Sequence, residues 1–401
     1  MNIFGKIKES WNKKGRFFKV VFIIVSIVFF IGVTGLWKAG SVFRKVSTGG
    51  GFFQNLAGVI PGINNDLKGE KEGRINILAL GMRGENVPGG GTLADTIMVI
   101  SIRTEDNKIS MISIPRDFYV DNPALGAKSK INAVYAYGEK NKKGGGIEDM
   151  KKVIGDVTGL TIHYGAVINF QGFSDFVDAI GGVDITLDNP FDESEQFNQS
   201  HVCDSFFNIP TGEYENKTKT YFSQETNTYK TRILASYPLC DAPVSELECG
   251  GSFKLPAGAQ TLNGEQALCY VRSRYTSSDF ERAKRQQQVI QLIKKKLFSA
   301  ETLTNFEKVN DMLNSLGDNV QTDMQLWEMK KMFGIYEKMN DPQIYQRVLE
   351  NSNEGLLYNP PAESYPGAGY ILLPIGDNYD KIRDLAENIF TMSNQSDIQP
   401  K

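Results

Sequence analysis

Short apolar runs alternate with helical patterns through the middle of the chain. The runs INILALG (75–81), TIMVISI (96–102) and KISMISI (108–114) are each bounded by glycine or a polar turn, which is typical of buried strands. Similar patterns predict strands at 163–170, 183–187, 267–275 and 369–376. Helical spacing predicts helices at about 146–158, 172–180 and 279–297, two more within 303–340, and a last one at 379–390.

Apolar strands that alternate with helices indicate a sheet covered on both faces. We therefore predict one large α/β domain over residues 72–390, with a mixed central sheet flanked by helices. Residues 192–252 are rich in Asn, Ser, Thr and Asp, and we interpret them as an insertion loop in this domain. The final residues, 391–401, are expected to form a disordered tail.

The N-terminus carries a long apolar segment. Residues 20–36 contain no charge and are followed by Trp37, so a helix of these 17 residues is about 26 Å long, close to the ~30 Å core of a bilayer. Six basic residues and one acid, Glu9, precede the segment, and this bias places residues 1–19 in the cytoplasm. We predict a single-pass anchor at 20–37, a stalk at 38–71 and an extracellular domain. A cleaved secretory peptide and a buried core helix are the alternatives.

The cysteines are compatible with export. Cys203, Cys240 and Cys249 all fall in the predicted loop, where an oxidising compartment would let two of them form a disulfide. Their pairing stays open because their number is odd. Cys269 lies in a segment that alternates like a strand and shares a face with Val271, so we expect it to be a buried free thiol.

Composition limits the class of ligand. The 401 residues include 44 Lys plus Arg and 47 Asp plus Glu, for a formal net charge of −3, so any anion site must be built locally from a few arginines. An exported, mildly acidic domain is also a poor candidate for binding nucleic acid. Two histidines and the lack of a Cys-x-x-Cys pair leave little material for a zinc site.

One stretch concentrates candidate chemistry. Arg272 and Arg274 are two residues apart on a predicted strand, so their side chains would share a face. Asp279, Arg282 and Gln286 follow at the spacing of one helical stripe. Arginines that converge on a helix N-terminus can form an anion site. In the alternative interpretation, the arginines are solvated or paired with carboxylates such as Asp279.

Two further clusters flank predicted strands. Arg116 and Asp117 follow the third strand, and ligand sites in open α/β sheets lie outside the carboxyl ends of strands. Asp95 precedes the second strand and follows the glycines at 89–91. That loop lacks the Gly-Lys-Ser/Thr of a nucleotide-binding loop, but the carboxylate of Asp95 would suit Mg²⁺ bridging to phosphate oxygens.

Taken in order, these segments resemble the LytR-CpsA-Psr family. The resemblance covers residues from about 75 to 300, after the single predicted N-terminal anchor. Its motifs are NILALG, ADTIMVISI, ISMISIPRD, KINAVYAYG, GFSDFVDAIGGVDI and LNGEQALCYVRSRYTSSDFERAKRQQQVI. The resemblance implies a phosphotransferase at the outer face of a bacterial membrane. Such enzymes move a glycopolymer, such as teichoic acid or capsule, from undecaprenyl pyrophosphate onto peptidoglycan.

The resemblance also implies roles for single residues. It implies that the pyrophosphate is held by Arg116, Arg272, Arg274, Arg282 and Gln286. Asp95 would bind Mg²⁺, Asp117 and Asp279 would support the arginines, and the polyprenyl tail would occupy an apolar tunnel between the sheet and its helices. Our catalytic candidates are therefore Arg116, Asp117, Arg272, Arg274 and Asp279, and Arg285 joins the candidates for substrate binding.

Two positions depart from the family pattern. Members commonly carry an acid where this chain has Arg83, and often an arginine where it has Leu93. The first departure removes an expected Mg²⁺ ligand, unless Glu85 or another carboxylate substitutes, and Arg83 could instead neutralise phosphate directly. A pyrophosphatase acting on lipid-linked glycans and a non-catalytic lipid-pyrophosphate binder are therefore the alternative functions. The sequence does not single out a general base.

Overall fold

The computed structural model describes residues 66–85, 91–193, 200–205, 207–241, 243, 248–273, 279–297, 316–339 and 342–392. Within these ranges, no helix is both long and apolar enough to cross a membrane. The anchor predicted at 20–37, most of the predicted stalk, and the first of the two helices predicted within 303–340 lie outside the described residues.

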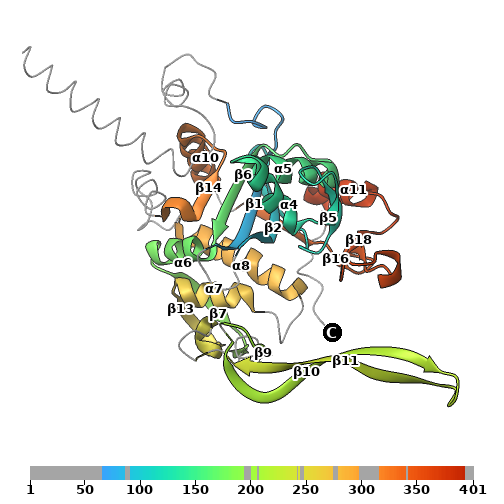
Figure 1. The fold of residues 1–401 in the computed structure, drawn as a ribbon. Coiled ribbons are helices and arrows are strands. Elements are labelled where there is room, and N and C mark those ends of the chain that lie inside the picture. The colour runs from blue at the N-terminus through green and yellow to red at the C-terminus, as the bar shows by residue number, and fades with distance from the viewer. Residues whose placement is uncertain are drawn as a thin grey trace, which may run out of the picture.

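A six-stranded mixed sheet forms the centre of the domain (Figure 1). Its strands are β1 (Ile75–Gly84), β2 (Gly91–Arg103), β3 (Lys108–Ser113), β6 (Tyr164–Asn169), β14 (Val320–Thr322) and β15 (Gln343–Val348). The order is β14-β6-β1-β2-β3-β15, in which β1 pairs parallel with β6 and β3 pairs parallel with β15, while the other pairs are antiparallel. The predicted mixed central sheet is thus confirmed.

The two faces of the sheet pack against different helices. Leu78, Leu80 and Met82 of β1 alternate onto one face and join the largest hydrophobic cluster. That cluster includes residues of α4 (Asn132–Asn141), α5 (Gly145–Thr158) and α11 (Asp380–Asn388). Ile75 and Ile77 point to the opposite face and pack with α10 (Leu326–Lys338). Helices therefore cover both faces, as the alternating pattern predicts.

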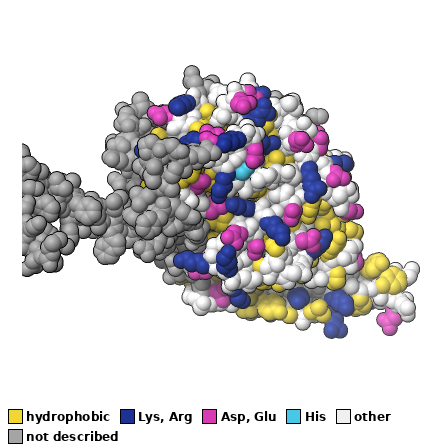
Figure 2. Space-filling view, turned by 90° about the horizontal axis from the view of Figure 1, so that it is seen from above, with side chains coloured by type: hydrophobic (Ala, Val, Ile, Leu, Met, Phe, Trp, Pro, Cys, Tyr) yellow, Lys and Arg dark blue, Asp and Glu magenta, His cyan; other side chains and the backbone are white. Residues whose placement is uncertain are grey.

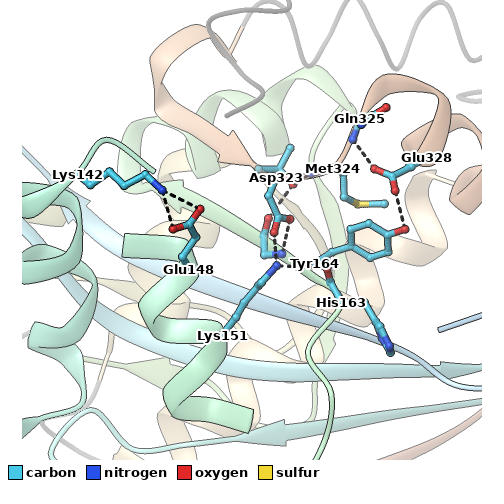
Figure 3. Close-up of polar contacts among 11 residues, drawn as sticks. Lys142, Glu148, Lys151, His163, Tyr164, Asp323, Met324, Gln325 and Glu328 are labelled. Carbon is cyan, nitrogen blue, oxygen red and sulfur yellow. Dashed lines mark hydrogen bonds and ion pairs between the residues drawn. The ribbon is translucent and has the colours of Figure 1, made fainter. Parts of the chain in front are cut away.

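A polar network fixes the β14 edge of the sheet (Figure 3). The Asp323 carboxylate accepts hydrogen bonds from the Gly165 amide at 2.8 Å and from Lys151 Nζ of α5 at 2.5 Å. The buried Tyr164 hydroxyl donates to Glu328 of α10 at 2.9 Å and accepts from the Lys68 amide. Buried polar groups need such partners, so this edge is held by specific contacts and not by apolar packing alone.

Residues 66–71, at the end of the predicted stalk, pack against this same edge. Leu67 is buried in the cluster that contains Ile75, Tyr164 and Met324. Glu70 receives a hydrogen bond from Lys331 at 2.5 Å. The folded domain therefore begins before residue 72.

A second core lies beside the sheet. It is built from α6 (Phe170–Ala179), β7 (Val183–Leu187), β13 (Gly258–Leu262), α7 (Gly264–Arg272) and α8 (Asp279–Leu297), with β7 and β13 forming their own antiparallel pair. The strand predicted at 267–275 is wrong, because α7 covers most of that segment. The helix begins with a capping box, in which Asn263 and Gln266 exchange side-chain and backbone hydrogen bonds.

The disulfides also correct the prediction. Cys203 pairs with Cys240, and Cys249 pairs with Cys269, so Cys269 is not a free thiol. The difference arises because the segment around Cys269 forms a helix and not the predicted strand. On α7, the Cys269 side chain packs in the second core next to Cys249, which lies in the short 3₁₀ turn Glu248–Gly251.

The predicted insertion loop is largely ordered. It contains β9 (His201–Val202) and a long hairpin of β10 (Ile209–Ser223) and β11 (Thr228–Asp241), which extends along the outside of the domain (Figure 1). A short pair, β8 (Phe191–Asp192) with β12 (Lys254–Leu255), lies at the two ends of this region, and a separate pair, β4 (Tyr119–Asn122) with β5 (Ala127–Lys130), follows β3. Both faces of the hairpin are mostly exposed, so its sequence lacks the apolar alternation that marks a half-buried strand.

The end of the chain departs from the prediction at 369–376. That segment does not close the central sheet. It supplies β18 (Leu373–Pro374) to a small sheet with β16 (Glu350–Asn351) and β17 (Leu356–Tyr358). Pro374 lacks the amide that a central strand needs, so this segment is unsuited to the interior of a sheet. The sixth strand is instead β15, which pairs with β3.

Candidate functional site

A cavity of about 400 Å³ opens where the start of β2, the loop after β3, helix α8 and strand β16 meet. Its polar lining residues are Asp95, Thr96, Ser113, Arg116, Asp117, Arg282, Gln286, Glu350, Asn351 and Tyr370. Its apolar lining residues are Ile97, Ile114, Pro115, Ala283, Val348, Leu349 and Leu372. Five of the residues singled out in the sequence thus line one cavity, although they come from three separate segments.

Arg116 is held between two carboxylates. Its Nη1 donates to Asp95 Oδ1 at 2.9 Å, and its Nε lies 3.5 Å from Asp117 Oδ2. Asp117 also accepts a hydrogen bond from Lys130 Nζ at 2.7 Å. The loop after β3 is fixed by the amide of Ile114, which donates to the carbonyl of Ile97 in β2. The guanidinium is therefore positioned before any ligand arrives, which limits the entropy lost on binding.

Helix α8 supplies the other two predicted side chains. Arg282 and Gln286 are one helical turn apart, so they share a face, and both line the cavity. The next residue, Gln287, is buried and donates to Ser113 Oγ at 2.9 Å and to the Arg347 carbonyl at 3.2 Å. This pair of bonds ties α8 to β3 and β15, and so fixes the position of the cavity-lining face.

Arg272 and Arg83 interact electrostatically with Asp95 but are not among the residues that line the cavity. Arg272 is the last residue of α7, and its guanidinium stacks over the Phe170 ring at 4.4 Å. Burial lowers the pKa of Arg272 to about 10, and the negative charge of Asp95 partly opposes this shift. Burial and the neighbouring Arg272 also lower the pKa of Arg83, again against the influence of Asp95. Asp95 is thus surrounded by three arginines.

Arg285 has a different environment from the other predicted arginines. Its side chain is buried, and it donates to the backbone carbonyls of Tyr270 (3.2 Å) and Ser273. Its guanidinium also lies over the rings of Phe191 and Tyr270. These contacts join the end of α7 to α8, and Arg285 is not among the cavity-lining residues.

Two predicted residues cannot be placed with the others. Arg274 lies outside the described residues, and so does the side chain of Asp279, whose backbone begins α8. The premise that Arg272 and Arg274 share a strand face is wrong, because Arg272 ends a helix. The stripe predicted for α8 is confirmed by Arg282 and Gln286 in the cavity and by Val289 in the second core.

The residues around Asp95 do not make a good magnesium site. Mg²⁺ takes hard oxygen ligands, often one or two carboxylates together with phosphate oxygens. Here the Asp95 carboxylate already pairs with Arg116, and the described part of the chain also places the charges of Arg83 and Arg272 near it. The described residues contain no group of three His, Cys, Asp or Glu placed to hold a metal ion. These residues fit poorly with the Mg²⁺ that the resemblance implies, so we derive no chemical step from this ion.

Sequence reasoning missed Glu350, Asn351 and Tyr370. Glu350 and Asn351 form β16, which the apolar pattern does not predict, whereas Tyr370 lies in the segment 369–376 that the pattern predicts as a strand. No local motif connects Glu350 and Asn351 to the arginines, because their contact depends on the parallel pairing of β15 with β3. Lys130 was also missed, although it is the first residue of the segment KINAVYAYG.

Known proteins resemble this chain over most of its length. It is 24% identical to the polyisoprenyl-teichoic acid–peptidoglycan teichoic acid transferase TagU of Bacillus cereus, over 92% of this chain and 98% of that protein. The TagU of Bacillus anthracis is 27% identical over 81% of this chain and 84% of its own length.

Solved structures show the same fold. TagT bound to LIIa-WTA superposes with a TM-score of 0.52 and 19% identity, covering 82% of this chain and 95% of that one. Bacillus subtilis TagV superposes with a TM-score of 0.50 and 21% identity, covering 80% and 98%. The model of the LytR_cpsA_psr family matches residues 58–364. The sequence match spans most of the chain and includes all cavity-lining residues except Tyr370 and Leu372, so the protein is a member of the LytR_cpsA_psr family.

Proposed function

We propose that the protein is a phosphotransferase that moves a glycopolymer from a polyprenyl pyrophosphate carrier, of the undecaprenyl type, onto peptidoglycan. The observation that carries this proposal is the convergence of Arg116, Arg282 and Gln286 on one cavity. Family membership and the names of the TagU relatives support it. The TagT structure bound to LIIa-WTA supports a lipid-linked wall polymer as the class of donor.

The cavity suits a pyrophosphate with an apolar tail. Arginines bind phosphate oxygens through charge-assisted, bidentate hydrogen bonds, and Gln286 can donate a further bond. The apolar side of the lining, which includes Ile97, Val348 and Leu372, offers a surface for hydrocarbon. Figure 2 shows basic and acidic side chains interspersed over one outer face of the domain, in keeping with the nearly balanced composition of the chain.

The chemistry follows from the donor. An acceptor hydroxyl oxygen bonds to the phosphorus that carries the glycopolymer, and the bond from that phosphorus to the bridging oxygen breaks. The electron pair leaves with the polyprenyl monophosphate. Arg116 and Arg282 would stabilise the charge that grows on the phosphate oxygens, which is the main task of a protein in phosphoryl transfer.

The test compares Arg282→Met with Lys295→Met, because Lys295 is exposed on the same helix and does not line the cavity. We expect Arg282→Met to weaken polyprenyl-pyrophosphate binding at least about tenfold, since a charge-assisted hydrogen bond contributes roughly 1.5–3 kcal/mol. The measurements are the melting-temperature shift caused by the lipid and transfer to a short peptidoglycan acceptor. Unchanged binding and transfer in Arg282→Met would contradict the site.

The same assay separates the alternative functions. A pyrophosphatase would release glycopolymer phosphate into water whether or not the acceptor is present. A non-catalytic binder would show the melting shift with neither release nor transfer. Transfer that depends on the acceptor is the result that the proposal predicts.

We also propose that residues 20–37 anchor the protein and that the domain lies outside the cell. The length of the apolar segment and the basic residues before it support this topology. The disulfides Cys203–Cys240 and Cys249–Cys269 are compatible with an oxidising compartment. A reporter that is active only in the cytoplasm, fused after Lys401, should be silent, and an active fusion would overturn the proposed topology.

A further inference from the structure

Three carboxylates line the cavity among the described residues, and they differ in their partners. Asp95 pairs with Arg116 at 2.9 Å, and Asp117 pairs with Lys130 at 2.7 Å. Glu350, on β16, makes no ion pair in the part of the chain that the structure describes. Accepting a proton would cost Asp95 or Asp117 its ion pair, whereas Glu350 would lose none.

Glu350 is held in place by its own turn. Ser352 Oγ donates to Glu350 Oε1 at 3.0 Å and accepts a hydrogen bond from the Gly355 amide at 2.8 Å, so the direction of the hydroxyl is set. The Glu350 amide donates to the Gly355 carbonyl, and the Ser352 amide donates to the Glu350 carbonyl. A Cβ added at Gly355 would lie 2.1 Å from Glu350 Cγ, so this glycine packs directly against the glutamate side chain.

The turn is also fixed relative to the arginines. The Leu349 amide donates to the Ser113 carbonyl at 3.0 Å, which ties the segment before Glu350 to the end of β3. Two residues after Ser113, the chain enters the loop that carries Arg116. Glu350 and Arg116 therefore line one cavity from two connected, rigid segments, as a catalytic group and its substrate-binding partner must.

From these contacts we propose that Glu350 accepts the proton of the acceptor hydroxyl. This assignment rests on the proposed transferase function. The hydroxyl oxygen bonds to the phosphorus that carries the glycopolymer, the bond from that phosphorus to the bridging oxygen breaks, and polyprenyl monophosphate leaves with the electron pair. The hydroxyl proton passes to the Glu350 carboxylate and then to solvent. Ser352 is a positioning residue, because it acts through the carboxylate that it orients.

The test replaces Glu350 with glutamine, which keeps the shape and the bond from Ser352. Loss of a general base reduces rates by about 10²–10⁴-fold. We expect Glu350→Gln to lose at least about 100-fold in transfer while its melting temperature and the shift caused by polyprenyl pyrophosphate stay at wild-type values. Glu354→Gln is the matched control, because it removes the same charge from an exposed position in the same turn. It should transfer at the wild-type rate.

The pH profile distinguishes a proton acceptor from a structural residue. The charged groups that share the cavity with Glu350 are Asp95, Asp117, Arg116 and Arg282. The wild-type rate of transfer should fall toward acid pH as the group that accepts the proton becomes protonated, and this fall should be absent in Glu350→Gln. Ser352→Ala should lose about 3–10-fold and keep the acid fall, because a single orienting hydrogen bond contributes about 1 kcal/mol.

The outcomes separate this assignment from the proposed function. If the wild type transfers and Glu350→Gln transfers within threefold of it, Glu350 is not the proton acceptor. An acid fall that persists unchanged in Glu350→Gln would also overturn the assignment. If the wild type binds the lipid but never transfers, the proposed function fails and this assignment fails with it.

Discussion

The buried cation at the end of α7 should reduce the stability of the empty protein. Arg272 stacks over Phe170 and faces Asp95, and burial lowers its pKa from 12.5 to about 10. A lowered pKa for a basic group means that the folded state disfavours the charged form. Replacing Arg272 by methionine removes the charge and keeps most of the apolar contact with Phe170.

The magnitude follows from three contributions. The fall in pKa corresponds to roughly 3 kcal/mol of free energy against the charged form, as an upper bound. The stacking of Arg272 on Phe170 stabilises the folded state by about 0.5–2 kcal/mol, and a cation at a helix C-terminus stabilises it by about 0.3–1 kcal/mol. We therefore expect Arg272→Met to leave the free energy of unfolding unchanged or to raise it by up to about 2 kcal/mol.

The ligand effect should have the opposite sign. A pyrophosphate beside Asp95 would meet Arg116 and Arg272, so losing Arg272 should weaken binding at least about tenfold. The assays are denaturant unfolding without lipid and the melting shift with polyprenyl pyrophosphate. Arg232→Met, on the exposed hairpin, is the control and should stay within about 0.5 kcal/mol of wild type. A loss of more than about 1 kcal/mol in Arg272→Met, with binding unchanged, would refute the reasoning.

Three further predictions follow from other contacts. Replacing both Cys203 and Cys240 by serine should destabilise the hairpin by about 3–4 kcal/mol, because the disulfide spans 37 residues, and limited proteolysis should then cut the hairpin while the melting temperature of the core holds. Gly69→Ala should cost about 2–4 kcal/mol in denaturant unfolding, since φ is +82° and the added Cβ would lie 2.4 Å from His163; a loss under 0.5 kcal/mol would contradict this. Chelation of divalent ions should leave the lipid-induced shift in melting temperature unchanged, because arginines surround Asp95. If chelation abolishes that shift, a magnesium site is present and the prediction is wrong.

The pH dependence of stability should carry a contribution from His163. Burial lowers the pKa of His163, whose Nδ1 accepts a hydrogen bond from the Asn76 amide. The neighbouring Glu72 carboxylate only partly opposes this lowering of the pKa. The unfolded state therefore binds more protons below about pH 6.5, so stability falls as the pH drops through that value. Unfolding of the wild type and His163→Gln from pH 7.5 to 5 should show a smaller fall in the variant. An equal fall would contradict the assignment.

The sequence predicts the central sheet well because its strands are buried on both faces. The runs at 75–81, 96–102 and 108–114 are nearly continuous in apolar residues, and they become β1, β2 and β3. The hairpin β10–β11 is missed for the opposite reason, since solvent covers both of its faces. The apolar pattern therefore reports the burial of a strand and not its intrinsic strand propensity.

The site was predicted where it depends on local spacing. Arg282 and Gln286 share a face because they are one helical turn apart, and any helix at that position would bring them together. The alternating pattern around Arg272 predicts a strand, yet Asn263 and Gln266, three residues apart, form a capping box that marks the start of a helix. Glu350 could not be found, because it reaches the cavity only through the pairing of β15 with β3.

The most direct test follows the phosphorus atom next to the sugar. A polyprenyl-pyrophosphate-linked glycopolymer, labelled at that phosphorus, is incubated with the full-length protein and peptidoglycan, and the label is traced after the wall is digested. The proposed transferase function predicts label in a phosphodiester between glycopolymer and peptidoglycan, and loss of this product in Arg282→Met. Label released as soluble glycopolymer phosphate, with none joined to peptidoglycan, would contradict it.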